Sequence, residues 1–173
     1  MIESCEKLNN QAIELASRGE YKEAIACFVR ALSIENQNHL LWYNLGLTYR
    51  DAGELKEAKA AIEKAFYIKP NDEEIIETLA LICYNLGVYE EAMGYVYLGL
   101  QLNNMNSHLW NTRGVLFFNT SDFINAEESF EQALSINPYY YDALFNLRDT
   151  YSELGNSIGV AECERRMKTL KRS

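Results

Sequence analysis

The sequence has few of the residues that build a catalytic or metal site. Its two histidines, His39 and His108, lie far apart in the chain, and its four cysteines stand singly at positions 5, 27, 83 and 163. None of these residues has the close spacing typical of metal-ligand sets. An HExxH motif and a phosphate-binding glycine loop are also missing from the sequence. We therefore expect no enzyme activity, no cofactor and no metal.

Basic charge is scarce as well. The chain has 16 Lys and Arg against 25 Asp and Glu, and residues 165–173 hold five of the bases and no acid. An acidic body repels phosphate backbones and anionic lipids, which disfavours nucleic acid as a partner. The alternative is nucleic-acid contact through the basic tail alone, which comprises Arg165, Arg166, Lys168, Lys171 and Arg172.

The chain also lacks a long apolar run at its start. Residues 1–10 include Glu3, Glu6 and Lys7, so we expect no signal peptide or membrane anchor there and no membrane insertion. The scattered cysteines are interpreted as reduced thiols. Together these features predict a cytoplasmic protein.

Only two prolines occur, while 48% of the residues are apolar and twelve are tyrosine, a composition that favours packed structure over disorder. A 34-residue period runs through the chain. Small residues recur at Ala24, Ala58, Ala92 and Ala126, and again at Ala12, Gly46, Ala80 and Gly114. Larger apolar residues recur in step at Phe28, Ile62, Val96 and Phe130. Such a period predicts stacked helical hairpins, in which close approach requires small residues.

Turn residues follow the same period. Gly19, Gly53, Gly87, Ser121 and Gly155 fall in the middle of successive units, and Pro70 and Pro138 close two of them, with Asn36 and Asn104 at the corresponding places elsewhere. These signals predict units at about 5–38, 39–72, 73–106, 107–140 and 141–173, within one domain over 1–173.

This set of residues resembles the tetratricopeptide repeat (TPR), most completely in Trp42, Leu45, Gly46, Tyr49, Gly53, Ala58, Ile62, Ala65 and Pro70. The fourth unit agrees except at Arg113. The resemblance implies an all-α, right-handed α-solenoid of about five helix-turn-helix hairpins. The fifth unit is interpreted as a degenerate capping pair, because Arg148 and Glu164 replace a small and a large apolar residue. These two side chains either form an ion pair or are solvated separately.

In this family the first helices of the hairpins line a concave face that holds an extended peptide, and the resemblance implies the same face here. Carried over to this sequence, the groove comprises Leu40, Tyr43, Asn44, Leu47, Arg50, Glu74, Glu77, Thr78, Leu81, Tyr84, His108, Asn111, Thr112, Val115, Phe118, Phe145 and Asn146. The aromatic members alternatively serve to pack the hairpins together.

A row at one repeated place, Asn10, Asn44, Thr78, Thr112 and Asn146, resembles the asparagine ladder of some family members. Asparagine both donates and accepts, so such a ladder can pair with a peptide backbone; alternatively the row is simply hydrated.

The expected function is therefore a protein–protein interaction module for an apolar and basic peptide or partner segment, because acids outnumber bases around the groove. The family's clamp for a terminal carboxylate is not matched, since Asn9, Ile13, Asn44, Glu74 and Thr78 occupy its places. The alternative function is a self-assembling scaffold, a homo-oligomer formed through the open ends and the groove.

Overall fold

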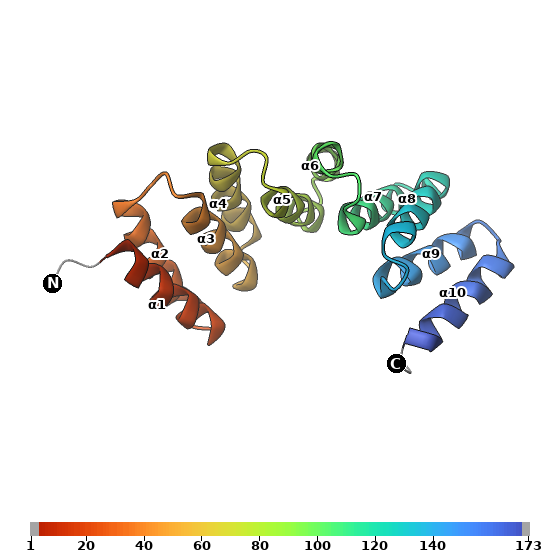
Figure 1. Ribbon diagram of the computed structural model, residues 1–173, viewed down its shortest axis with the longest axis horizontal. Helices are drawn as coiled ribbons and strands as arrows, with labels where there is room; N and C mark the ends of the chain where they lie inside the picture. The colour runs from red at the N-terminus through yellow and green to blue at the C-terminus, as the bar shows by residue number, and fades with distance from the viewer. Residues whose placement is uncertain (1–3, 171–173) are drawn as a thin grey trace. The chain divides into compact units, whose positions relative to one another are not determined.

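The computed structural model describes residues 4–170, which form ten α-helices and no strand. Figure 1 shows them along the chain from red to blue. The helices are α1 (Cys5–Ser17), α2 (Tyr21–Ile34), α3 (His39–Asp51), α4 (Leu55–Ile68), α5 (Glu73–Asn85), α6 (Tyr89–Leu102), α7 (Ser107–Asn119), α8 (Phe123–Ile136), α9 (Tyr141–Glu153) and α10 (Ser157–Leu170).

The chain divides into two compact units, Met1–Val88 and Tyr89–Ser173, and the division falls between α5 and α6. Unit 1 contains α1 to α5 and unit 2 contains α6 to α10. The prediction of a single domain over 1–173 stays a prediction.

The starts of the helices follow from N-cap residues at the 34-residue period, a signal that we did not use above. Ser4, Asn38, Asp72 and Asn106 each accept a hydrogen bond from a backbone N–H in the first turn of α1, α3, α5 and α7. These acceptors satisfy donors that the helix itself leaves unpaired. Tyr140 occupies the same place before α9 without a side-chain cap.

The turn inside each hairpin needs one residue in the left-handed region. Gly53 has φ of 82° and Ser121 has φ of 59°. The five turn residues named from the sequence all have positive φ, so this prediction is confirmed: Gly19, Gly53, Gly87, Ser121 and Gly155. Glycine adopts this conformation without strain, whereas the Cβ of Ser121 makes it less favourable there.

Close helix packing occurs at the repeated small residues. A Cβ on Gly46 would lie 2.5 Å from Ile62 Cδ1, and one on Gly114 would lie 2.5 Å from Phe130 Cε1. Hence α3 packs on α4 in unit 1, and α7 packs on α8 in unit 2, only because those positions lack a side chain.

The last hairpin also has a close contact at a glycine, but at other positions, with the glycine on its second helix. Arg148 occupies the place of Gly46, and the close contact is made instead by Gly159 of α10 against the ring of Tyr151 of α9. Met167 and Cys163 of α10 are buried against this hairpin, while Glu164 is exposed. One face of α10 therefore packs and the other faces solvent, as expected of a capping helix.

Candidate functional site

The first helices of unit 1 present exposed apolar side chains. Leu40 at the start of α3 is 57% exposed and Leu81 on α5 is 43% exposed. Leu47 and Tyr84 are half-buried on the same two helices. Side chains of this size left in water can gain free energy when a partner covers them.

Tyr43 and Thr78 are buried in unit 1, and they connect α3 to α5. The Tyr43 hydroxyl lies 2.9 Å from Thr78 Oγ1, and only 8% of each residue is exposed. Burial raises the pKa of Tyr43 to about 12, with the hydrogen bond between Tyr43 and Thr78 opposing this shift and the Glu74 carboxylate adding to it. Both residues were predicted to line a groove; their burial means that they offer little surface to a partner.

Thr112 in unit 2 is buried in the same way, at 5% exposure, and its hydroxyl donates to the carbonyl of His108 within α7. The predicted row of Asn10, Asn44, Thr78, Thr112 and Asn146 therefore has two threonines that act in packing. Asn10 is exposed and accepts a hydrogen bond from Asn9.

The asparagines pair with each other between successive hairpins. Asn44 Nδ2 donates to Asn9 Oδ1 at 3.4 Å in unit 1, and Asn146 Nδ2 donates to Asn111 Oδ1 at 3.0 Å in unit 2. The separation is 35 residues, as it is for Tyr43 and Thr78. The 34-residue period does not predict the pairing of Asn9 with Asn44, because the two residues are 35 positions apart. Within the described residues, these pairs leave the Oδ1 atoms of Asn44 and Asn146 as acceptors for a partner.

The first helices of unit 2 carry a more aromatic set. Phe145 on α9 is exposed, with the guanidinium of Arg148 4.2 Å from its ring centre. Val115 and Phe118 on α7 are half-buried, and the Phe118 ring meets that of Phe123 edge-on at 5.3 Å. Phe118 thus takes part in packing between α7 and α8. His108 is exposed at the start of α7, with its ring 5.0 Å from that of Tyr140.

The two arginines beside these residues are paired with acids. Arg50 bonds Asp51 in unit 1, and Arg148 bonds Asp149 with Nη2 2.6 Å from Oδ1. Glu74 at the start of α5 is exposed, and no lysine or arginine pairs with it among residues 4–170. Glu77, one turn further along α5, is half-buried. The face of unit 1 is therefore negative beside its exposed leucines.

Two arginines of the C-terminal hairpin have partners in the structure. The ion pair considered for Arg148 and Glu164 is not formed, because Arg148 pairs with the carboxylate of the neighbouring Asp149. Arg166 is half-buried and donates to the Pro138 carbonyl at 2.8 Å. Arg165 is exposed and pairs with Glu162. Lys171 and Arg172 of the basic tail lie outside the described residues.

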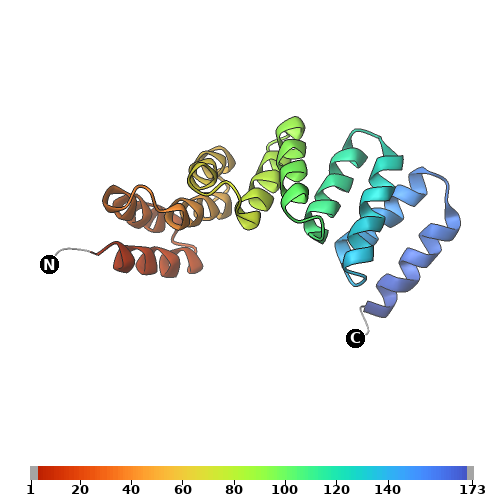
Figure 2. The same ribbon diagram turned by 45° about the horizontal axis from the view of Figure 1, so that its top comes forward.

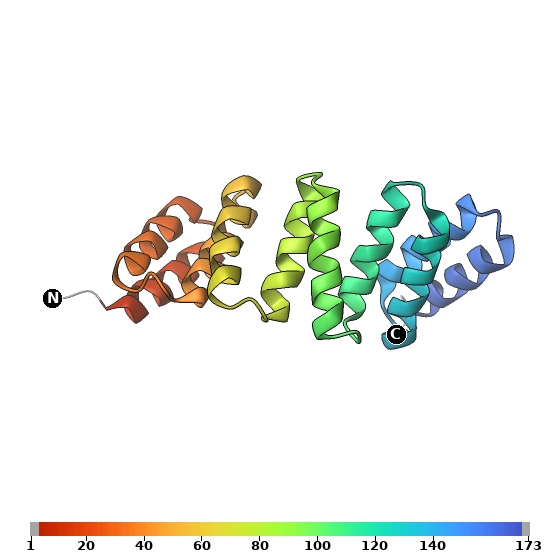
Figure 3. The same cartoon turned by 90° about the horizontal axis from the view of Figure 1, so that it is seen from above.

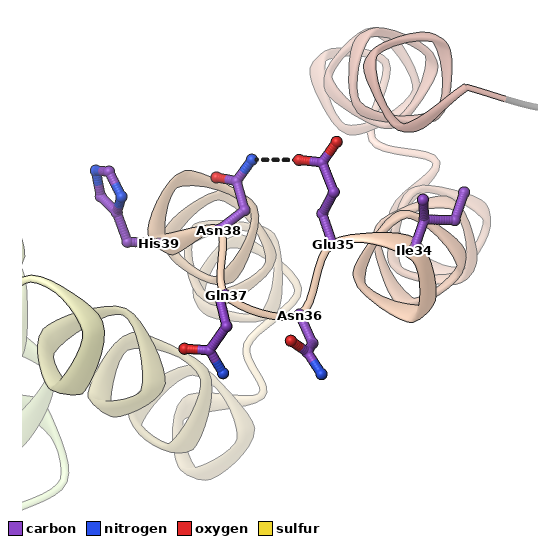
Figure 4. A pocket seen from close by; sticks show the side chains of 6 residues that line it. All are labelled: Ile34, Glu35, Asn36, Gln37, Asn38 and His39. Carbon is purple, nitrogen blue, oxygen red and sulfur yellow. Dashed lines mark hydrogen bonds between the residues drawn. The ribbon is translucent and has the colours of Figure 1, made fainter.

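The rest of the described chain shows no further candidate site. None of the four cysteines forms a disulfide, and all four are buried. Over residues 4–170 we find no cluster of His, Cys, Asp and Glu that could bind a metal. In the same range, each helix is too short or too polar to cross a bilayer. A shallow pocket of about 440 Å³ lies on the α2–α3 turn, and its side chains from Ile34 to His39 point in several directions (Figure 4). It therefore offers no convergent set of polar groups.

Models of two repeat families match the chain. The model described as a TPR repeat matches residues 12–53, and that described as a tetratricopeptide repeat matches residues 40–72 and 107–140. The chain belongs to the tetratricopeptide-repeat family. The matches include the second and fourth of the units predicted from the sequence, in which the repeat residues are most complete.

A curated relative is the TPR repeat-containing protein MJ1428 of Methanocaldococcus jannaschii. It is 30% identical over 132 residues, which cover 69% of this chain and 23% of the relative. The chain thus spans about a quarter of the length of that protein.

Solved structures establish the fold. MamA of Desulfovibrio magneticus superposes with a TM-score of 0.89 at 14% identity, covering 99% of this chain and 97% of that one. YrrB, described as a TPR protein with an unusual peptide-binding site, gives 0.76 at 22% identity, covering 96% and 86%. At this identity the likeness concerns the fold alone, which is an all-α TPR solenoid.

Proposed function

We propose that this TPR chain is a protein–protein interaction module that binds an extended peptide of apolar and basic character on the first helices of its hairpins. The observation that carries the proposal is the combination of exposed Leu40 and Leu81 with Glu74, a carboxylate that no cation in the described chain neutralises. Apolar side chains of a peptide would cover the leucines, and a lysine or arginine would pair with Glu74.

The asparagine pairs support an extended ligand. Asn44 Nδ2 donates to Asn9 Oδ1, so the side chain is held in one orientation, and its own Oδ1 is available to accept a hydrogen bond from a ligand. A carbonyl oxygen held in this way can accept from a peptide backbone N–H whatever the side chain of that residue is. In unit 2, Asn146 is held by Asn111 in the same manner. YrrB, described as having a peptide-binding site, shares the fold.

Peptide selection on the immobilised chain tests the proposal. A random-peptide display library is selected on the native chain and on the variant Glu74→Lys/Glu77→Lys, whose helices should be intact because both substitutions lie on a partly or fully exposed surface. We expect the native chain to enrich peptides with Leu or aromatic residues near Lys or Arg, and the variant to lose them. Salt should weaken this binding, since the charges are exposed.

A matched control is Glu54→Lys/Glu57→Lys, which places the same charge change before and within the first turn of α4, a second helix. It should enrich the same peptides as the native chain. If acidic peptides are enriched, or if both double variants lose binding equally, the proposed site is wrong. If only further copies of the chain are captured, the scaffold alternative is favoured instead.

A further inference from the structure

Two stretches of unit 2 contain no acidic residue and no lysine or arginine. Residues 102–112 and 132–141 contain no Asp, Glu, Lys or Arg, although such residues make up 24% of the chain. They include the α6–α7 and α8–α9 turns, which lie at the same edge of unit 2 (Figures 2 and 3). The equivalent turns of unit 1 contain Glu35, Lys69 and Asp72. We call the two turns of unit 2 the neutral edge.

The neutral edge exposes two large apolar side chains at equivalent places of successive hairpins. Met105 is 61% exposed and Tyr139 is 75% exposed, and Leu102 at the end of α6 is exposed beside them in the sequence. The corresponding residues of unit 1 are the polar Gln37 and Asn71. Methionine and tyrosine are enriched in protein interfaces, whereas charged residues are depleted from interface centres.

Both turns are fixed by the same local hydrogen bond. Asn103 Oδ1 accepts from the Met105 N–H at 2.9 Å, and Asn137 Oδ1 accepts from the Tyr139 N–H at 3.2 Å. The α6–α7 turn is also tied to α7, because Trp110 Nε1 donates to the Asn104 carbonyl at 2.8 Å. A surface held in its binding conformation loses little entropy when a partner covers it.

The two turns are also held beside each other. The His108 and Tyr140 rings, which follow the two turns in the chain, lie with their centres 5.0 Å apart, and α7 contacts α9. Arg166 reaches the α8–α9 turn from α10, where it donates to the Pro138 carbonyl, so this cation is already bonded to the turn. The exposed side chains of the two turns, Met105 and Tyr139, are apolar, and Arg166 lies beside them on the α8–α9 turn.

We propose that the neutral edge is a self-association surface whose occupant is a second copy of this chain. The chain carries a net charge of -9, so two copies repel each other on average. The two turns of the neutral edge carry no carboxylate, so two copies can meet there without adding to that repulsion. In a two-fold contact the same surface serves both copies, so Met105 of each copy packs on Tyr139 of the other. A thioether sulfur against an aromatic ring is a favourable contact, and here it forms twice.

Sedimentation velocity over a roughly hundredfold range of concentration tests this proposal. We expect a reversible monomer–dimer equilibrium that strengthens slightly with added salt, because salt screens the repulsion between the two acidic chains. The variant Met105→Gln/Tyr139→Asn, which restores the residue types of unit 1, should weaken the dimer by at least about tenfold. The control is Ile124→Gln/Ile158→Asn, which removes two equally exposed apolar side chains at the starts of α8 and α10 without changing charge. Its dimer should match that of the native chain.

Disulfide trapping tests the predicted pairing of residues. The native cysteines are buried, so Met105→Cys and Tyr139→Cys each add one exposed thiol. A mixture of the two variants, one of them carrying a tag, should give mixed disulfide dimers faster than either variant alone. A chain that stays monomeric throughout, a dimer that persists unchanged in Met105→Gln/Tyr139→Asn, or equal trapping in the single variants would overturn the proposal.

Discussion

The Tyr43 hydroxyl lies 2.9 Å from Thr78 Oγ1, although the two residues are 35 positions apart in the chain. Asn9 with Asn44 and Asn111 with Asn146 are bonded at the same separation. Each bond joins the first helices of neighbouring hairpins one position out of step with the repeat. These bonds therefore help to fix the position of each hairpin relative to the next within its unit.

Tyr43→Phe should lower the stability of unit 1. The substitution keeps the buried ring but leaves the Thr78 hydroxyl without its partner, so we expect a loss of about 1 kcal/mol in the free energy of unfolding. Urea unfolding followed by circular dichroism measures it. The double variant Tyr43→Phe/Thr78→Val should recover part of the loss, because no buried polar group is then left unpaired. A loss that is purely additive would show that the hydrogen bond contributes nothing.

The contribution of Tyr43 should also depend on pH. Burial raises its pKa from 10.0 to about 12 in the folded chain, so folding favours the neutral phenol. This stabilisation is complete below pH 10 and is lost as the pH rises from 10 to 12. We expect the difference in urea midpoint between the native chain and Tyr43→Phe to shrink over that range. A difference that is constant between pH 9 and 12 would contradict the assignment.

Much of the fold could be predicted from the sequence because small residues, large apolar residues and turn residues recur at a fixed period. Gly46 with Ile62 and Gly114 with Phe130 are visible as small and large residues at a fixed spacing, and they make the close contacts found in the structure. The last hairpin was harder, since its glycine, Gly159, lies on the second helix and contacts Tyr151 of the first, and neither stands at the repeated places. A search for residues at a fixed period cannot find a contact that uses other positions.

The candidate site was less predictable. Helical spacing shows which residues share a face of a helix. It does not show that Leu40 is exposed whereas Tyr43, on the same helix, is buried against the first helix of the next hairpin. That difference depends on contacts between helices of different hairpins. The neutral edge could have been noticed as two stretches without charge, yet only the structure shows that Met105 and Tyr139 are exposed on neighbouring turns.

Two helix glycines should respond to alanine in opposite directions. A Cβ added to Gly94 on α6 would have no atom within 4 Å, so Gly94→Ala should stabilise unit 2 by about 1 kcal/mol through helix propensity. Gly114→Ala gains the same propensity but places its Cβ 2.5 Å from Phe130, which should cost about 1–3 kcal/mol. Thermal unfolding of both variants measures the contrast. Adding Phe130→Leu to Gly114→Ala should relieve the clash, and a stable Gly114→Ala single variant would show that α7 and α8 separate freely.

Ser121→Gly should stabilise unit 2, because Ser121 is the one non-glycine with positive φ among the described residues. A side chain in the left-handed region costs roughly 1–2 kcal/mol, and the substitution removes this cost. The greater freedom of glycine in the unfolded chain offsets part of the gain, so we expect the free energy of unfolding to rise by about 1 kcal/mol. The matched control is Gly155→Ser, which places serine at the equivalent turn and should destabilise by a similar amount. Urea midpoints of the two variants should therefore move in opposite directions. If Ser121→Gly is neutral while Gly155→Ser is costly, a local interaction of the Ser121 side chain offsets its strained backbone.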